Sequence, residues 1–302
     1  MYNRSVTYTP NFDPIQYKNN MRLNWNTVAS KYHEDWASTS IGPFKSTTEL
    51  VKFGEIKQND IVLDLACGTG AVSNEVVKHL HDSSVGDHVS DRTTLVGIDI
   101  SRVALSIAKS SISTHRFPGP CFIEMDSENL GFRTASFNKI LCQFGLMFFP
   151  NASHVIKQLN DILIRGGKLV ISVHGTAKGV PYFSCIMNSI LKHIPDIRPK
   201  GSPSVHTFGN SDDLYNVLEI AGFHNISIKK YTFLYQAGTF DEYWSDYMSS
   251  TANSIRSVME SKGTHLLSQI KEDSKVSADR FTDIDGILTF PWVVLIATAH
   301  KC

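Results

Sequence analysis

The stretch VLDLACGTG at residues 62–70 joins an apolar run to a segment with helical periodicity. The run Ile61–Leu65 is typical of a strand that is buried on both faces. Gly68 and Gly70 can adopt positive φ angles and let a ligand approach the backbone closely. The next helix offers free N–H groups at its start. We therefore predict a ligand-binding turn at the carboxyl end of a central strand, as in doubly wound α/β folds.

Strands and helical segments alternate outward from this turn, from about residue 57 to residue 175. Helical stripes separate the apolar runs, and Ser101 is placed to cap one of these helices. This repetition predicts a parallel sheet with right-handed crossovers. The polar residues 81–94 are predicted to form a surface loop. The further strands of this part are expected at residues 95–100, 121–124, 137–142 and 168–173.

The second half of the chain predicts two more strands, at residues 223–235 and 290–300, which makes a mostly parallel sheet of seven strands. Ser211 is expected to cap the helix before residue 223, and Gly222 to end it in a left-handed conformation. The predicted organisation is an N-terminal helical cap over residues 1–50 and an α/β domain over residues 51–302. Helical insertions, expected as lids, interrupt this domain at about 176–206 and 239–285.

Composition excludes several classes of protein. Lys and Arg total 29, and Asp and Glu also total 29, so no basic face for nucleic acid is expected. The five cysteines are scattered and never spaced as CxxC, which argues against a zinc site or a disulfide framework and favours a reducing compartment. The longest apolar stretch, residues 290–299, is too short to span a bilayer. We expect a cytoplasmic protein with no bound metal and no membrane span.

The charge at the turn separates two classes of ligand. A dinucleotide fold would show the pattern GxGxxG, but Ser73 stands at the third glycine position. The carboxylate of Asp64 would repel a pyrophosphate, whereas it suits the cationic sulfonium and ammonium groups of S-adenosyl-L-methionine. An NAD-dependent oxidoreductase is therefore the weaker alternative. The other alternative is that the segment is an ordinary strand-to-helix turn with no ligand.

The stretch 62–70 resembles motif I of the class I S-adenosylmethionine-dependent methyltransferases. Four later segments resemble further motifs of that family in the right order, over residues 25–175 and loosely over 205–235. The overall pattern is similar to the ubiquinone and menaquinone methyltransferase group and its relatives, although quinone-specific signatures are not clearly present. The chain departs from the family in its long segment 81–94 and in Arg165, where a proline is common. The four segments are VGIDIS (96–101), MDSENL (125–130), CQFGLMFFP (142–150) and IRGGKL (164–169).

The resemblance implies a Rossmann-like methyltransferase fold and a set of residues that bind the cofactor S-adenosyl-L-methionine. Asp99 would accept hydrogen bonds from both ribose hydroxyls, and Asp126 would accept one from the adenine amino group. Tyr32 matches a position that covers the methionine end of the cofactor in related enzymes. The implied cofactor-binding residues are Tyr32, Asp64, Ala66, Cys67, Gly68, Thr69, Gly70, Asp99, Ile100, Asp126, Ser127 and Gln143.

Methyl transfer from a sulfonium is an in-line displacement, so alignment and exclusion of water are the main tasks of the protein. A general base is needed only when the nucleophile holds its proton too tightly. His174, just past the fifth strand, and His33, beside Tyr32, are the candidate catalytic residues.

The substrate is predicted to be a small molecule. The chain lacks the Asn/Asp-Pro-Pro-aromatic string of nucleic-acid amino methyltransferases after the fourth strand, and it has no cytosine-directed Pro-Cys pair. An aromatic stripe at residues 240–248 would favour an apolar or aromatic acceptor if it formed a lid. A protein or RNA substrate, and an inactive methyltransferase-like scaffold subunit, remain the alternatives.

Overall fold

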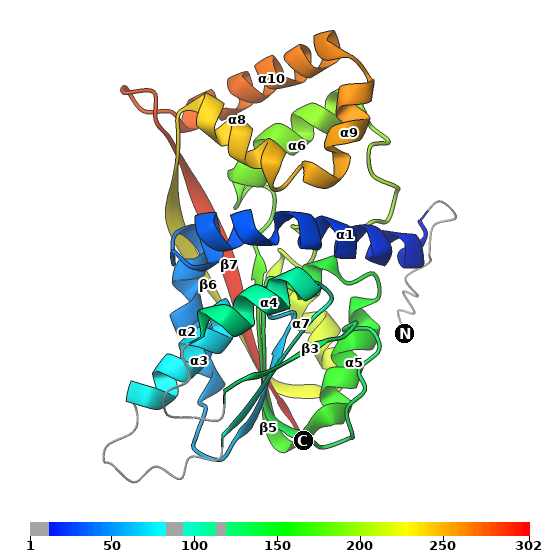
Figure 1. The fold of residues 1–302 in the computed structure, drawn as a ribbon, viewed down its shortest axis with the longest axis vertical. Helices are drawn as coiled ribbons and strands as arrows, with labels where there is room; N and C mark the ends of the chain where they lie inside the picture. The colour runs from blue at the N-terminus through cyan, green and yellow to red at the C-terminus, as the bar shows by residue number, and fades with distance from the viewer. Residues whose placement is uncertain (1–11, 83–92, 113–118) are drawn as a thin grey trace.

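The computed structural model of the chain describes residues 12–82, 93–112 and 119–302. It contains a seven-stranded sheet in the order β3-β2-β1-β4-β5-β7-β6, in which only β7 runs antiparallel to its neighbours (Figure 1). The predicted doubly wound, mostly parallel sheet is thus confirmed. Most of the predicted loop at 81–94 lies outside the described residues. The strands are β1 (Ile61–Leu65), β2 (Thr94–Asp99), β3 (Cys121–Glu124), β4 (Phe137–Gln143), β5 (Leu163–His174), β6 (Phe223–Gly238) and β7 (Leu288–Lys301).

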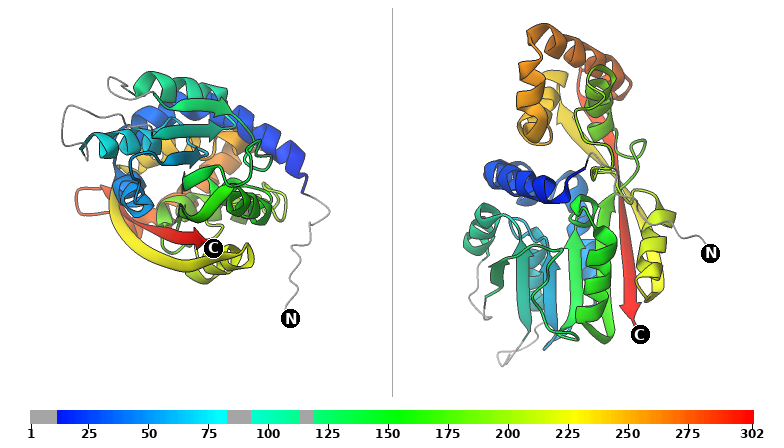
Figure 2. Two further views of the ribbon diagram at one scale, coloured as in Figure 1. Left: turned by 90° about the horizontal axis from the view of Figure 1, so that it is seen from below. Right: turned by 90° about the vertical axis from the view of Figure 1, so that its right-hand side faces the viewer.

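Helices cover both faces of the sheet, with α3 and α4 on one side and α5 and α7 on the other (Figure 2). The register brings the carboxyl ends of β1, β2 and β3 together, since Leu65 aligns with Ile98 and Asp99 aligns with Glu124. The helices are α1 (Pro14–Tyr32), α2 (Thr47–Gly54), α3 (Ala71–Asp82), α4 (Arg102–Ser111), α5 (Ala152–Ile162), α6 (Pro181–His193), α7 (Ser211–Ile220), α8 (Phe240–Ser249), α9 (Asn253–Ser261) and α10 (Thr264–Ala278).

Side-chain caps set several helix ends. The Ser101 hydroxyl accepts a hydrogen bond from the Ala104 N–H, which confirms the predicted cap of α4. At α7 the prediction was wrong by one residue, because the Asn210 side chain accepts from the Asp212 N–H and Ser211 is the first helical residue. Gly222 follows α7 with a φ of 87°, as predicted for a left-handed helix end.

The fifth strand begins five residues before the predicted start. β5 pairs with β4 at Leu163, and the register then shifts by way of Gly166, which has a φ of 73°. The glycine pair therefore forms an irregularity within the strand, because its backbone freedom lets the chain bulge and resume pairing at Lys168.

Four helices stand above the carboxyl edge of the sheet as one layer, formed by α6, α8, α9 and α10 (Figures 1 and 2). The long antiparallel pair β6 and β7 extends beyond the other strands to reach this layer. An ion pair of 2.8 Å between Lys192 and Asp273 joins α6 to α10. Helices from both predicted insertions thus pack together. Helix α1 runs between this layer and the sheet (Figure 2).

The aromatic stripe on α8 packs inside the helical layer. Tyr243 and Tyr247 are fully buried, and their hydroxyls donate to the backbone oxygens of Tyr182 and Phe183 on α6. The sequence left open whether this stripe lines a ligand or packs in a core, and the structure shows that these rings build the core between α8 and α6. Among the described residues, no helix is both long and apolar enough to cross a membrane.

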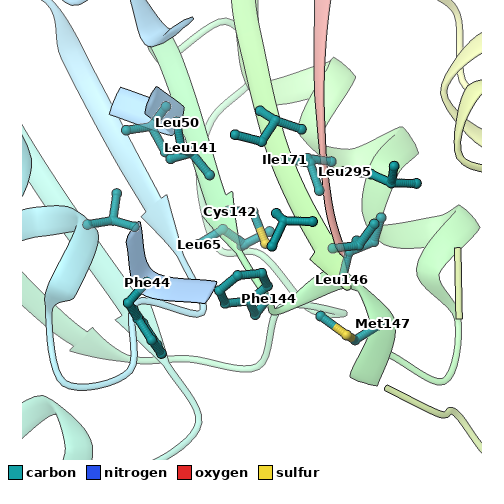
Figure 3. Close-up of a cluster of buried hydrophobic side chains, with 14 of the residues drawn as sticks. Phe44, Leu50, Leu65, Leu141, Cys142, Phe144, Leu146, Met147, Ile171 and Leu295 are labelled. Atoms are coloured by element: carbon teal, nitrogen blue, oxygen red, sulfur yellow. The ribbon is translucent and has the colours of Figure 1, made fainter. Parts of the chain in front are cut away.

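The main core lies under the carboxyl ends of β1, β4 and β5. Leu141 lies beside Leu50 of α2 there, and Leu65 lies beside Cys142 (Figure 3). This packing holds the strand ends rigidly. The side chains at the cavity floor, such as Phe144, therefore sit on a fixed base.

Candidate active site

A cavity of about 690 Å³ lies between the carboxyl edge of the sheet, α1 and the helical layer. Its size falls within the range that small-molecule sites occupy in proteins. Its walls come from the ends of β1, β2, β4 and β5, from α1 and α6, from the segment 197–205, and from α9. Four of the five motif segments found in the sequence therefore meet at one cavity, and the segment 164–169 does not line it.

The glycine turn after β1 meets this cavity along one side. Ala66, Gly68 and Thr69 line the cavity, whereas Cys67 and Gly70 do not. Gly68 has a φ of 54°, and a side chain there would project into open space. Gly70 has a φ of 88°, and a Cβ atom there would lie 3.0 Å from the Cβ of Ala108 on α4. Gly68 thus leaves room for a ligand, while Gly70 lets α4 approach the turn.

Asp64 lies beneath the turn. Its side chain is fully buried and does not line the cavity, and the Ser73 hydroxyl donates to Oδ2 at 2.6 Å. Oδ1 has no hydrogen-bond partner among the described residues. Loss of hydration raises the pKa of Asp64 to about 7, although the hydrogen bond from Ser73 opposes the rise. The carboxylate supports the turn from below.

Asp99, at the end of β2, both holds the turn and lines the cavity. Its carboxylate accepts hydrogen bonds from the Gly68 N–H at 2.9 Å and from the Ser101 N–H at 2.8 Å. Burial raises the pKa of Asp99, and these backbone hydrogen bonds counteract part of the effect. Each carboxylate oxygen can accept a second hydrogen bond, so Asp99 can still receive two donors from a ligand. Ile100 lines the cavity beside it.

Asp126 follows β3 and is held by a lysine from α1. The ammonium of Lys18 lies 2.7 Å from Asp126 and 2.9 Å from Glu128. Partial burial opposes ionisation, but hydrogen bonds from Lys18 and the Glu128 backbone hold the pKa of Asp126 below its usual range. Ser127 lines the cavity between the two acids. Lys18 could not be predicted as a site residue from the sequence, because only the docking of α1 brings it to these acids.

Tyr32 and Gln143 reach the cavity from different elements, the end of α1 and the end of β4. The Tyr32 ring packs against Phe44 with 5.8 Å between ring centroids, and burial followed by the charge of Asp99 raises its pKa. Gln143 ends β4, where it accepts a hydrogen bond from Thr47 at 3.1 Å. Both side chains line the cavity.

The two candidate histidines have different surroundings. His33 does not line the cavity, and its Nδ1 lies 3.0 Å from the Thr69 hydroxyl, so it holds the glycine turn from outside. His174 does line the cavity, and its ring stacks on Phe144 with 4.3 Å between centroids. Burial, followed by the charge of His206, lowers the pKa of His174 to about 3.

The tautomer of His174 follows from its partner. The indole Nε1–H of Trp292 donates to Nδ1 of His174 at 3.1 Å, and an indole nitrogen can only donate. Nδ1 is therefore the unprotonated nitrogen, and the neutral ring carries its proton on Nε2. His174 is thus arranged to donate a hydrogen bond from Nε2.

Aromatic rings form the wall around His174. They come from segments far apart in the sequence, and only tertiary packing brings them together. Tyr182 and Trp292 stack with 5.1 Å between centroids, and Trp36 of the π-helical turn η1 (His33–Ala37) packs 5.4 Å from Trp292. The aromatic residues of this wall are Trp36, Phe44, Phe144, Tyr182, Phe183 and Trp292.

Comparison with protein families matches one model, described as a methyltransferase domain, to residues 56–222. The demethylmenaquinone methyltransferase of Bacillus cereus strain ATCC 10987 is 24% identical over 195 residues, which cover 61% of this chain and 78% of that protein.

Two solved structures share the fold at low sequence identity. One is phosphoethanolamine N-methyltransferase 2 of Haemonchus contortus in complex with phosphomonomethylethanolamine and S-adenosylhomocysteine. It is 13% identical with a TM-score of 0.57, over 94% of this chain and 60% of that one. The other is the YcgJ protein of Bacillus subtilis, which is 14% identical with a TM-score of 0.55, over 85% of this chain and 98% of that one.

Proposed function

Because this chain belongs to the class I S-adenosylmethionine-dependent methyltransferases, we propose that it methylates a small molecule with a flat, apolar body. The family excludes the alternative of an NAD-dependent oxidoreductase. The observation that carries the proposal is the aromatic wall of Phe144, Phe183 and Trp292 in a cavity covered by α1 and the helical layer.

The residues at the ends of β1 to β3 fit the cofactor. Asp99 has free lone pairs for the two ribose hydroxyls, and the space above Gly68 admits a ligand against the backbone. Asp126 would accept a hydrogen bond from the adenine amino group, which requires its carboxylate to accept from this donor as well as from Lys18. When bound, S-adenosylmethionine supplies a methyl group that its sulfonium has already activated for displacement.

The enclosure of the cavity supports a small acceptor. Helix α1 packs against the strand ends through Lys18, and the Asn26 side chain accepts a hydrogen bond of 2.8 Å from the Ser101 hydroxyl. A folded protein or an RNA would have to displace α1 to reach the cavity floor. An apolar molecule can enter and still exclude water from the reacting atoms.

His174 would act on the acceptor by donating a hydrogen bond from Nε2. A neutral donor stabilises an oxygen nucleophile that is losing its proton, as in a phenol or an enol. Burial that lowers the pKa of His174 to about 3 makes the ring a weak base. We therefore propose His174 as a positioning donor for an acidic hydroxyl, in place of the general base suggested by the sequence.

Two measurements test the proposal. Isothermal titration calorimetry with S-adenosylhomocysteine should detect one-to-one binding in the micromolar range. Labelled methyl transfer should then be found with phenolic or hydroxyquinone acceptors and not with bulk protein or RNA. Methylation of RNA or protein alone would contradict the small-molecule assignment. A folded sample that binds no S-adenosylhomocysteine would favour the scaffold alternative.

A further inference from the structure

One charged side chain of the cavity lining has neither an ion pair nor a hydrogen bond among the described residues. The lining includes five charged residues, of which three are acids that follow β2 and β3 and a fourth is Lys18 of α1. Lys18 pairs with Asp126 and Glu128, and Asp99 accepts backbone hydrogen bonds. The fifth residue is Arg198. It forms no ion pair or hydrogen bond with any residue in the described parts of the chain.

Arg198 lines the same cavity as His174, where further rings pack beside the imidazole. The ring of Phe183 lies 5.2 Å from that of His174, and the ring of His206 lies 6.1 Å from that of Phe183. Burial lowers the pKa of His206, and the positive charge of Arg198 adds to this effect.

The surroundings of Arg198 offer donors without a counter-charge. Tyr17, Asn20 and Ser202 line the same cavity, and the charge of Arg198 also acts on Tyr17. The acidic residues of the described lining follow β2 and β3, and none of them forms an ion pair with Arg198. A half-buried guanidinium with no acid beside it attracts an anion, and its planar fork matches a carboxylate with two parallel hydrogen bonds.

We propose that the acceptor is an aromatic acid whose carboxylate binds Arg198 while its hydroxyl end lies at His174. This inference rests on the proposed function and names the substrate class of the same cavity. His174 and Arg198 line the same cavity. The carboxylate would be an anchor, and the methyl group would go to the oxygen of the hydroxyl end. That hydroxyl would lose its proton to solvent, the C–S bond of the sulfonium would break, and S-adenosylhomocysteine would leave.

The experiment compares matched acids and amides in the full-length protein saturated with S-adenosylhomocysteine. The probes are 4-hydroxybenzoate, 6-hydroxy-2-naphthoate and 4′-hydroxybiphenyl-4-carboxylate, each beside its carboxamide. Calorimetry should show that at least one acid binds about tenfold or more tightly than its amide, since a charge-assisted pair is lost in the amide. Arg198→Gln should remove this preference and leave the amide affinity unchanged.

Arg165→Gln is the matched control, because Arg165 is exposed on β5 and does not line the cavity. It should preserve the preference for the acid. Equal binding of acid and amide, a preference that survives in Arg198→Gln, or no binding of any acid would each overturn the inference. S-adenosylhomocysteine is titrated separately into every variant. Its failure to bind the wild type would contradict the proposed function itself, whereas normal cofactor binding without acid preference would remove only the anchor.

Discussion

The indole N–H of Trp292 donates to Nδ1 of His174 across 118 positions of sequence. That single bond makes the imidazole a neutral donor, because Nδ1 is occupied as an acceptor and the remaining proton sits on Nε2. Phe144 stacks on the same ring and shields it from water. A histidine in an active site is commonly a general base, but His174 is thereby arranged to donate a hydrogen bond from Nε2.

Replacing His174 by Gln should lower kcat about tenfold, the effect of losing one hydrogen bond to the reacting oxygen. The pH profile of kcat/KM should keep its shape between pH 5 and pH 8, because a ring with a pKa of about 3 does not titrate there. Steady-state kinetics across that range would check it. A fall in kcat/KM near pH 6 to 7 that is present in the wild type and absent in His174→Gln would instead indicate that His174 is a general base.

Asp99→Asn should weaken binding of S-adenosylhomocysteine by about 10- to 100-fold, from loss of charge-assisted hydrogen bonds. The same substitution turns an amide N–H₂ toward a backbone N–H, so the glycine turn should also become less stable. Glu124→Gln is the control, since Glu124 is the register partner of Asp99 on β3 and does not line the cavity. Equal affinities for the two variants would contradict the ribose assignment.

Alanine substitutions at three glycines with positive φ angles should distinguish the effect of backbone strain from the effect of ligand contact. Gly68→Ala should cost about 1 kcal/mol of stability through its φ of 54° and should also weaken S-adenosylhomocysteine binding, because its Cβ enters the space above the turn. Gly166 has a φ of 73° and equally open surroundings, but it lies outside the cavity. Gly166→Ala should therefore cost a similar amount of stability and leave the affinity for S-adenosylhomocysteine unchanged.

Gly70→Ala should be the most destabilising of the three, by about 2–4 kcal/mol, because Ala108 crowds its Cβ in addition to the strain. Urea melts and calorimetry on the three variants would measure both quantities. Retention of cofactor affinity in Gly68→Ala would show that the open space above the turn is not used.

Asp64 should make the protein less stable as the pH rises from about 4 to about 7. In that range the unfolded chain has lost the Asp64 proton while the folded protein still holds it, since the pKa rises from 3.8 to about 7 on folding. The free energy of unfolding then falls with pH, by up to about 4 kcal/mol from this group. Asp64→Asn should remove this contribution.

Urea denaturation at pH 4.5, 6 and 8 would test that prediction against the wild type. Asp161→Asn serves as the control, because Asp161 is exposed on the surface. Parallel stability curves for the wild type and Asp64→Asn would mean that the carboxylate is already ionised in the folded protein at pH 4.5.

Local patterns in the sequence predicted the scaffold of the site. The apolar run before Asp64, the glycines after it and the acids at 99 and 126 depend on neighbours within a few residues, so their positions at strand ends can be read from periodicity. The helix caps were equally local, and the shift from Ser211 to Asn210 came from two adjacent residues that are both good caps. The aromatic stripe on α8 was ambiguous, because a helical face has the same spacing whether it lines a cavity or a core.

The sequence by itself therefore determined the succession of strands and helices, the glycine turn and the acids at the strand ends. Only the tertiary structure decided what those groups can do. The pair of Lys18 with Asp126 spans 108 positions, and the pair of Trp292 with His174 spans 118. No periodicity encodes such contacts, because they exist only once α1 and β7 have packed against the strand ends. The charge state of His174 and the isolation of Arg198 follow from that packing, since burial and partners set them.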